Sequence, residues 1–174
     1  MSGINVLVVS DTHGDFIIIE QLLENYHGTI NAAIHLGDHA RDMSRFVRSK
    51  KDSSQPKPID IHIVNGNTDP LAEAYDDRVI DIAGKQIFIT HGHRYSVKTS
   101  YDNIIYKAQE LQVDACLFGH THIQTLFKEN DTLFMNPGSL TYPQPTNTPG
   151  YALLRISEED KITGKLLQYK SRRE

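Results

Sequence analysis

Residues 4–15 read INVLVVSDTHGD, an almost unbroken apolar run that changes abruptly into a polar turn. The apolar part, Ile4–Val9, is typical of a strand that is buried on both faces. The polar part presents a carboxylate at Asp11 and an imidazole at His13, directly after the strand. The glycine at position 14 allows the chain to turn sharply there. This stretch therefore predicts a buried strand with potential metal ligands at its carboxyl end.

Four more polar turns follow apolar runs along the chain: Gly37-Asp38-His39, Gly66-Asn67-Thr68-Asp69, His91-Gly92-His93 and Gly119-His120-Thr121-His122. Taken singly, Asp11, Asp38 and Asn67 are also explained as helix caps or turn residues. The two His-x-His turns are more specific, because they place four of the nine histidines in two tripeptides. Isolated histidines such as His35 are interpreted as core or surface residues. Converging strand ends would gather the five turns into one metal site.

Apolar periodicity predicts strands and helices that alternate in the first two-thirds of the chain and give way to strands and turns in the last third. The predicted strands are Ile4–Val9, Ala32–Leu36, Asp60–Val64, Arg78–Ile82, Gln86–Thr90, Asp114–Phe118, Gln124–Lys128, Thr132–Met135, Tyr151–Ile156 and Gly164–Tyr169. The predicted helices are Asp15–Tyr26, Arg41–Lys50 and Ser100–Leu111. Loops are expected at Ser53–Pro58 and Tyr142–Gly150. This order predicts an α/β sandwich whose second sheet is built from the later hairpins.

The length and composition suit one soluble domain, and we expect residues 1–174 to form a single unit. The 18 basic and 22 acidic residues give a net charge of −4, which argues against a nucleic-acid platform. No apolar run approaches the roughly 20 residues needed to span a bilayer, so no membrane partner is expected. The single cysteine, Cys116, excludes an intrachain disulfide, and together these features predict a cytoplasmic protein. A homo-oligomer is left open, with Tyr142–Tyr151 as a candidate contact.

The mixture of carboxylate, amide and imidazole donors suits manganese, iron, zinc, cobalt or nickel better than calcium or a thiolate-held zinc. Seven donors exceed what one ion normally takes from a protein, whereas two ions that share a carboxylate would use them all. Two metals about 3.5–4 Å apart are a known arrangement for phosphoryl transfer. Two dications, two Asp carboxylates and one hydroxide carry a charge of about +1 (4 − 2 − 1), which matches a monoanionic phosphodiester.

The ordered set of five turns resembles the calcineurin-like metallophosphoesterase superfamily. Within it, the length, the spacing and the motif Asn136-Pro137-Gly138-Ser139 are most similar to the small bacterial and archaeal phosphodiesterase branch, which also contains the retromer scaffold subunit. The resemblance covers residues 4 to about 140. It implies an α/β fold in the form of a four-layer α/β/β/α sandwich, with two mixed sheets flanked by helices.

The resemblance also implies a dinuclear metal site with one bridging carboxylate. By that resemblance the first ion is held by Asp11, His13, Asp38 and His122. Asp38 bridges to a second ion, which is completed by Asn67, His91 and His120. The expected cofactors are therefore two divalent metal ions, with Mn2+ favoured and Ni2+, Co2+, Fe2+ or Zn2+ as alternatives.

One position departs from the family pattern. Many superfamily members have His directly after the metal-binding Asn, where it assists the leaving group, and this chain has Thr68. A threonine hydroxyl has a pKa far too high for a general acid. Either another residue takes this role, with His93 or His39 as candidates, or the leaving group must already be good. We predict His93 as the catalytic residue; the alternative is that it orients a ligand. Arg94 is considered as a phosphate contact or as the partner of an ion pair.

The predicted function is that of a metal-dependent phosphodiesterase, which hydrolyses a small phosphodiester with a hydroxide activated by two metal ions. A phosphomonoesterase or a nucleotide pyrophosphohydrolase is the alternative enzyme. The alternative from another class is a catalytically idle scaffold with the same fold. Loss of ligands would favour the scaffold, and because all seven positions keep side chains that can bind metal, the sequence favours the enzyme.

Overall fold

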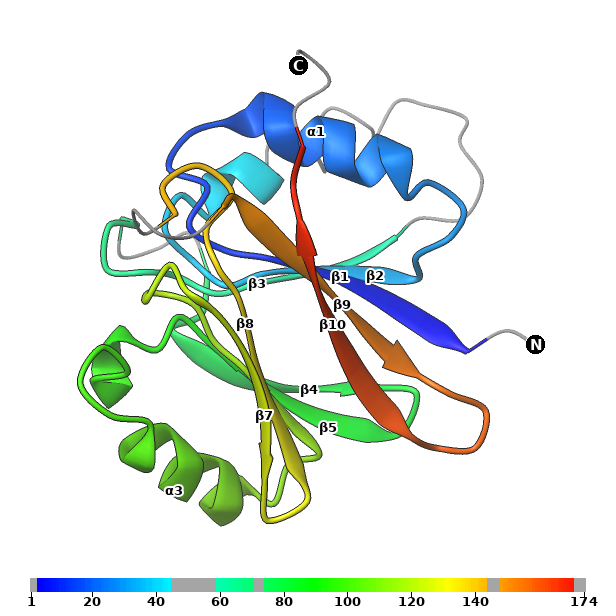
Figure 1. Ribbon diagram of the computed structural model, residues 1–174, viewed down its shortest axis with the longest axis vertical. Helices are drawn as coiled ribbons and strands as arrows, with labels where there is room; N and C mark the ends of the chain where they lie inside the picture. Colours follow the sequence, from blue (N-terminus) through cyan, green and yellow to red (C-terminus); the bar gives the residue numbers. More distant parts are fainter. Residues whose placement is uncertain (1–2, 45–58, 71–73, 144–147, 171–174) are drawn as a thin grey trace.

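Two five-stranded β-sheets form the centre of the protein, as seen in the computed structural model (Figure 1). The structure describes residues 3–44, 59–70, 74–143 and 148–170. In the first sheet the strand order is β10-β9-β1-β2-β3. These strands are β1 (Ile4–Val9), β2 (Ala32–His35), β3 (Asp60–Ile63), β9 (Gly150–Ile156) and β10 (Ile162–Gln168). The first three are parallel, β9 pairs antiparallel with β1, and β10 pairs antiparallel with β9, so the sheet is mixed.

The second sheet is also mixed and has the order β4-β5-β6-β8-β7. Its strands are β4 (Asp77–Ile82), β5 (Lys85–Thr90), β6 (Ala115–Leu117), β7 (Gln124–Glu129) and β8 (Thr132–Pro137). The central strands β5, β6 and β8 are parallel, and hairpin partners lie outside them. Asn130 and Asp131 connect β7 to β8 with φ angles of 47° and 65°. Two successive positive φ angles are those of the hairpin turn whose twist matches the flanking strands.

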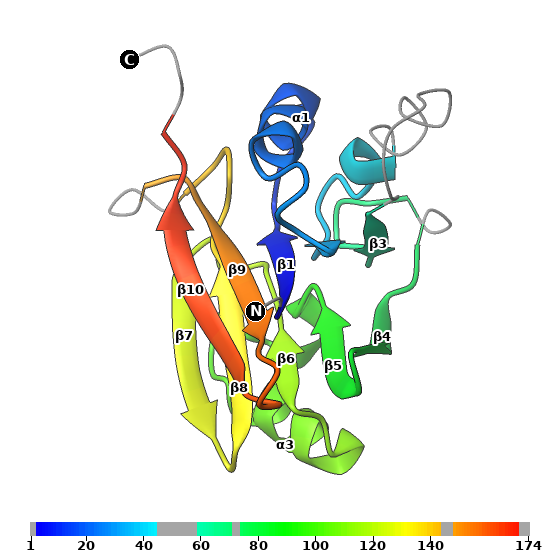
Figure 2. The ribbon, with the colours of Figure 1, turned by 90° about the vertical axis from the view of Figure 1, so that its right-hand side faces the viewer.

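Helices cover the outer face of each sheet, which gives four layers (Figures 1 and 2). Helix α1 (Phe16–Asn25) packs on the first sheet, and α3 (Asp102–Leu111) packs on the second. Strand β1 is almost entirely apolar because both of its faces are covered: Val8 lies in the core between the sheets, while its neighbour Leu7 packs beneath α1. Both side chains are at most 1% exposed. The predicted four-layer α/β/β/α sandwich of two mixed sheets is therefore confirmed.

Each predicted strand is present, with ends that differ by no more than two residues from the prediction. Helices α1 and α3 are each shorter than predicted, beginning at Phe16 and Asp102. Of the predicted helix Arg41–Lys50, residues 41–44 are helical, and the remainder lies outside the described residues, as does the predicted loop Ser53–Pro58. None of the described helices is both long enough and apolar enough to cross a membrane.

The polar turns all lie beyond the carboxyl ends of parallel strands. Strands β1, β2 and β3 lead into three of them, and β5 and β6 lead into the other two. The carboxyl ends of parallel strands in one sheet share an edge, which is where α/β proteins form their binding crevices. Because two such edges meet across the sandwich, five turns that are distant in sequence come together.

Candidate metal centre

Four of the predicted ligands form one compact group. A donor atom from each of Asp11, His13, Asp38 and His122 lies within 4.8 Å of a donor atom of each of the others. Asp11 and Asp38 are buried, and the two histidines are half-buried. These residues come from the turns after β1, β2 and β6, so both sheets contribute. They are the four residues expected at the first ion.

The remaining three predicted ligands form a second group around His91. The Nε2 atom of His91 lies 3.2 Å from Oδ1 of Asn67 and 3.2 Å from Nδ1 of His120. It also lies 3.5 Å from Oδ1 of Asp38. Asp38 therefore belongs to both groups, as expected of the bridging carboxylate. The structure brings all seven predicted ligands to one place.

The histidine ring of His91 is oriented so that a bare nitrogen points into the site. Its Nδ1 atom lies 2.7 Å from the carbonyl oxygen of Leu36, which can only accept a hydrogen bond. Nδ1 therefore carries the proton, and in the neutral ring Nε2 has a free lone pair. This lone pair faces the oxygens of Asn67 and Asp38, which are also acceptors there. Several lone pairs that converge on one point are stabilised by a cation between them, so the donor set fits a metal ion.

His122 shows the same arrangement at the first group. Its Nδ1 lies 2.6 Å from the carbonyl oxygen of Tyr142, and its Nε2 lies 3.0 Å from Oδ1 of Asp11. Either a proton or a metal ion must separate that nitrogen from the carboxylate. Without metal the proton takes this place: the hydrogen bond to Asp11 raises the pKa of His122, although burial opposes it. Binding of a metal would displace this proton.

Two further histidines of the site favour the neutral, metal-binding form. Burial lowers the pKa of His120 to about 4, and the nearby His91 and Lys98 act in the same direction. Burial also lowers the pKa of His13, despite the opposing effect of the two carboxylates. The Nε2 atom of His13 is buried without a hydrogen-bond partner among the described residues. A buried acceptor of this kind fits a metal ligand better than a structural histidine.

Most of the ligands occupy a backbone conformation that non-glycine residues seldom adopt. The φ angle lies between 46° and 67° for the following ligands: Asp11, His13, Asp38, His120 and His122. This left-handed region is uncommon for residues with a Cβ, and strained conformations of this sort cluster at functional sites. The surrounding structure must therefore hold the turns in place.

Glycines allow the ligand turns to touch one another. A Cβ on Gly37, whose φ is 94°, would lie 2.6 Å from the backbone nitrogen of Gly66. A Cβ on Gly66 would in turn collide with the carboxylate and backbone of Asp38. The turns after β2 and β3 are thus in backbone contact, and no larger residue fits at either glycine without moving a ligand.

Asp69 connects the same two turns through hydrogen bonds. Its Oδ1 accepts from the backbone N–H of Ala40 at 2.9 Å, and its Oδ2 accepts from that of Gly66 at 2.8 Å. Thr68 adds a backbone N–H that donates to Oδ1 of Asp38 at 3.0 Å. The position where the family commonly has histidine therefore contributes a main-chain contact to the bridging carboxylate.

A buried chain of three side chains connects the turns after β1 and β2. The hydroxyl of Thr12 donates to Oδ2 of Asp42 at 2.8 Å and accepts from Nε2 of His35 at 3.0 Å. The other ring nitrogen of His35 accepts from the N–H of Gly37. Asp42 also accepts from the N–H of Gly14. All three side chains are at most 5% exposed; the sequence indicated a core or surface position for His35 and no role for Thr12 or Asp42. No local sequence pattern predicts these hydrogen bonds, since Thr12 is 23 residues from His35 and 30 residues from Asp42.

The segment after β8 supports the first and last turns. Asn136 donates from Nδ2 to the carbonyl oxygen of Gly119 at 2.8 Å and to Oγ1 of Thr121 at 3.0 Å. The hydroxyl of Ser139 donates to the carbonyl oxygen of Asp11 at 2.8 Å. The motif Asn136-Pro137-Gly138-Ser139, which contributed to the resemblance, therefore holds the turns that carry His120, His122 and Asp11.

His93 and His39 lie on opposite flanks of the cluster. The ring centroid of His93 is 5.4 Å from that of His91 and 6.1 Å from that of His120. The ring of His39 is 5.8 Å from that of His13. Each has a buried Nδ1 without a hydrogen-bond partner in the described part of the chain. His93 thus borders the second group and His39 the first.

Arg94 forms an ion pair and does not lie free beside the ligands. Its Nη1 is 2.8 Å from Oδ2 of Asp76, and both side chains are about half exposed. Of the two interpretations left open from the sequence, the structure supports the ion pair.

The fold and the side-chain cluster define an α/β sandwich protein with a candidate metal site at its strand ends. A profile of the calcineurin-like phosphoesterase superfamily domain matches residues 4–159. The probable metallophosphoesterase MG207 of Mycoplasma genitalium is 33% identical over 171 residues, which is 95% of each chain. The probable metallophosphoesterase YsnB of Bacillus subtilis is 30% identical over 159 residues, covering 91% of this chain and 88% of its own. The chain belongs to the calcineurin-like phosphoesterase superfamily, and the resemblance inferred from the five turns is confirmed.

Solved structures agree with this assignment. A predicted phosphoesterase from Streptococcus pneumoniae superposes with a TM-score of 0.74 and 28% identity, over 97% of this chain and 99% of that one. A protein described as a novel archaeal phosphodiesterase superposes with a TM-score of 0.70 and 22% identity, over 94% of this chain and 100% of that one. Vps29 of Entamoeba histolytica, solved with Zn2+, superposes with a TM-score of 0.68 and 20% identity, over 94% of this chain and 98% of that one. The last two share the fold. Together the homologues support a phosphoesterase hydrolase with a metal site.

Proposed function

We propose that this protein is a metal-dependent phosphodiesterase that hydrolyses a small phosphodiester. One observation carries the proposal: seven donor side chains from five turns converge, and Asp38 belongs to both donor groups. A single structural ion would need about four of these donors. Two ions that share Asp38 would use all seven, and two-metal sites are suited to phosphoryl transfer.

Each donor group would hold one ion in this proposal. Asp11, His13 and His122 would bind the first, Asn67, His91 and His120 the second, and Asp38 both. When bound, two such ions supply Lewis acidity, which neutralises phosphate charge and lowers the pKa of water. Manganese is the favoured metal, because nitrogen and oxygen donors are mixed and no thiolate is present among them. Nickel, cobalt, iron and zinc also match this donor set.

The charge of the site favours a phosphodiester as substrate. Only Asp11 and Asp38 contribute carboxylates, and the histidines with lowered pKa remain neutral near pH 7. Two dications, two carboxylates and one hydroxide would leave about +1, which matches a monoanionic phosphodiester. The described residues around the cluster provide no pair of arginines of the kind that would recognise a dianionic monoester, since Arg94 is paired with Asp76.

His93 is the proposed catalytic residue at the leaving group. It borders the second donor group, and its side chain is only partly buried, so the ring can contact a substrate oxygen. Thr68 does not supply a proton, because a hydroxyl is too weak an acid. His39 occupies the equivalent place beside the first group and is the alternative.

The proposal is tested by hydrolysis of bis-p-nitrophenyl phosphate with Mn2+, Ni2+, Co2+, Zn2+ or Fe2+ added to metal-stripped protein. We expect activity that requires metal, exceeds that on p-nitrophenyl phosphate, and is lost in Asp38→Ala and His120→Ala. Asp81→Ala serves as a control, because this aspartate lies on β4 and, in the described part of the chain, accepts hydrogen bonds from Gly84 and Gln86 of its own hairpin. Higher activity on the monoester would instead indicate a phosphomonoesterase.

The alternative from another class is a scaffold, and the shared fold with Vps29 is the observation that favours it. The retention of all seven donors argues for the enzyme, because a scaffold has no need of convergent, buried lone pairs. Absence of hydrolysis with every one of the five metals, in protein shown to bind them by calorimetry, would establish the scaffold in its place.

A further inference from the structure

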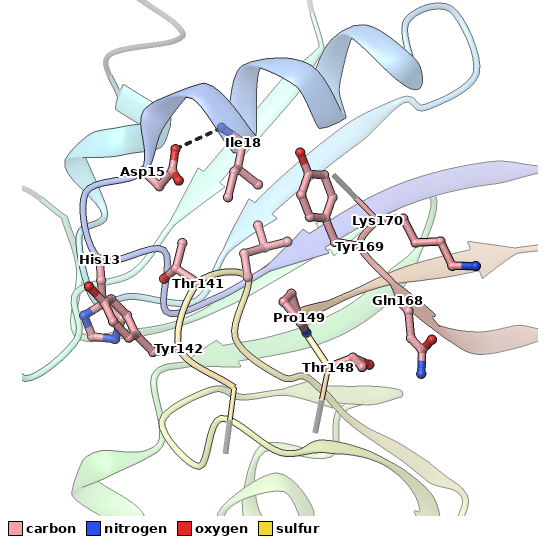
Figure 3. Close-up of a pocket in the computed structure, with 11 residues that line it drawn as sticks. His13, Asp15, Ile18, Thr141, Tyr142, Thr148, Pro149, Gln168, Tyr169 and Lys170 are labelled. Carbon is pink, nitrogen blue, oxygen red and sulfur yellow. Dashed lines mark hydrogen bonds between the residues drawn. The ribbon is translucent and has the colours of Figure 1, made fainter. Parts of the chain in front are cut away.

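A cavity of about 770 Å³ opens directly beside the first donor group. His13 and Tyr142 line one end of it, and Gln168 and Lys170 line the other (Figure 3). The wall between them includes Ile18 of α1. A phosphate held at the metal ligands would therefore extend any attached group into this space. A cavity of this size exceeds what a phosphate alone fills and falls in the range of small-molecule sites.

The end of the cavity beside the ligands is held in a fixed position. The carbonyl oxygen of Tyr142 accepts a hydrogen bond from His122 Nδ1 at 2.6 Å. The backbone N–H of Tyr142 donates to Oγ of Ser139 at 2.9 Å. Next to it, the hydroxyl of Thr141 lies 3.1 Å from the carbonyl oxygen of Thr12. The backbone at position 142 is thus bonded to the turn that holds a metal ligand. A group bound here would have a fixed orientation relative to the reacting phosphate, which is what catalysis by positioning requires.

The side chain of Tyr142 is the most informative feature of the cavity. It is 63% exposed although it contacts the ring of His13, with centroids 5.2 Å apart and an angle of 80° between the planes. An exposed aromatic face beside a metal site provides a surface on which a planar ring can stack. An aromatic side chain can stack with any flat ring, including any nucleobase, because every such ring has a π-face.

The other walls suit the body and the edge of such a ring. Ile18, Leu140 and Pro149 provide apolar contacts. At the far end, Gln168 and Lys170 line the cavity, and their exposed side chains extend away from Tyr142, so that an amide and an ammonium group lie at its outer rim (Figure 3). A flat apolar body with polar groups at its outer edge is the chemistry that these walls complement, and an alkyl group would leave the aromatic face uncovered.

We propose that this cavity binds a planar aromatic group joined to the substrate phosphate, stacked on Tyr142, so that the protein selects aryl or nucleoside phosphodiesters over alkyl ones. This inference rests on the proposed function, since it assumes that a phosphate occupies the donor groups. It names the class of substrate that the function alone leaves open.

Binding of phosphonates tests the proposal without turnover, because their C–P bond is not hydrolysed. Calorimetry with manganese-loaded protein would compare phenylphosphonate with ethylphosphonate. We expect phenylphosphonate to bind about tenfold more tightly, the factor that a ring stacked on one aromatic side chain supplies. Tyr142→Ala should bring the ratio of the two affinities close to one, whereas Tyr142→Phe should keep it. Tyr106→Ala, which removes a tyrosine of similar exposure on α3, should leave the ratio as in the wild type.

A third ligand distinguishes the two sources of the ring. If thymidine 5′-monophosphate binds more tightly than phenylphosphonate, and Gln168→Ala removes this excess, the group is a nucleoside. If the two bind equally, it is a simple aryl group. Equal affinity for phenylphosphonate and ethylphosphonate, in protein that hydrolyses bis-p-nitrophenyl phosphate, would overturn the cavity proposal and leave the proposed function intact. Selective binding of phenylphosphonate without any hydrolysis would overturn the function and leave the cavity assignment.

Discussion

Asp38 Oδ1 lies 3.5 Å from His91 Nε2, although the same carboxylate also belongs to the group formed with Asp11, His13 and His122. One side chain thereby connects ligands from the two sheets. Its own position is fixed by the N–H of Thr68, which donates to Oδ1 at 3.0 Å. Asp38 is thus the carboxylate that the two donor groups share.

Substitution of Asp38 should therefore affect both metal ions. We expect Asp38→Ala to bind neither ion tightly, whereas His13→Ala should lose the first and Asn67→Ala the second. The measurement is the metal content of the purified variants by elemental analysis after manganese loading, with calorimetry for the affinities. Full retention of one tightly bound ion by Asp38→Ala would contradict the bridging role.

The chain from His35 through Thr12 to Asp42 should position the first donor group. Thr12→Val keeps the shape of the side chain and removes its hydroxyl, which leaves the buried Nε2 of His35 without its partner and removes one of the two hydrogen bonds to Asp42 Oδ2. Such an unsatisfied group costs about 1–3 kcal/mol in the free energy of unfolding. Loss of an outer hydrogen-bond partner also typically weakens metal binding by about 10–100-fold.

Urea unfolding of metal-free protein measures the first effect of Thr12→Val, and manganese titration measures the second. The control is Thr163→Val, an exposed threonine on β10 that should change neither quantity. A variant that loses stability but binds manganese as tightly as the wild type would show that the hydrogen bonds of Thr12 stabilise the fold and do not position the metal ligands.

The sequence was sufficient to predict the strands and the ligand cluster, because both follow local rules. Apolar runs such as Ile4–Val9 leave no doubt about burial, and a polar turn directly after such a run places its side chains at a strand end. The order of the elements predicted a sandwich with a second sheet, and the resemblance added its four-layer form. Exact ends were less predictable: β8 continues to Pro137 because its pairing with β7 extends that far.

The supports of the site could not be predicted from the sequence. Asp42 reads as a helix-face residue, and only the tertiary structure brings it to Thr12, 30 positions earlier. The cavity beside His13 is likewise formed by segments from both ends of the chain, including Ile18 and Lys170. Such contacts depend on how α1 packs on the first sheet and how β10 pairs at its edge, and hydrophobic periodicity predicts neither arrangement.

His35 should make the stability of the metal-free protein depend on pH. Burial lowers the pKa of its ring to about 4, below its ordinary value of 6.5. The unfolded chain therefore binds this proton more readily, so the stability present above pH 6.5 falls as the pH decreases toward 4. The loss for this group amounts to about 3 kcal/mol, at 1.36 kcal/mol for each pH unit.

The contribution of His35 is isolated by comparison with His35→Gln, which does not titrate and retains a donor toward Thr12. Urea unfolding between pH 4 and 8, in the presence of a chelator, should give a shallower slope for the variant. His13 and His120 of the metal site also have lowered pKa values and act in the same direction, whereas the raised pKa of His122 acts in the opposite one, so the difference between the two proteins is the relevant quantity. Parallel curves would show that His35 is not the group responsible.

His93 should matter most when the leaving group is poor. If its ring donates a proton to the departing oxygen, His93→Asn should lower the rate on a phenyl ester by about 10²–10⁴-fold, the usual contribution of general acid catalysis. A p-nitrophenyl ester needs less assistance, because its leaving group is already a stable anion, and its rate should fall much less.

The measurement is the rate for a series of aryl phosphodiesters of differing leaving-group pKa in wild type, His93→Asn and His39→Asn. A steeper dependence in His93→Asn alone assigns the role to His93, and in His39→Asn alone to His39. If the slope is unchanged in both variants, neither histidine donates the proton, and His93 orients the neighbouring His91 ring instead.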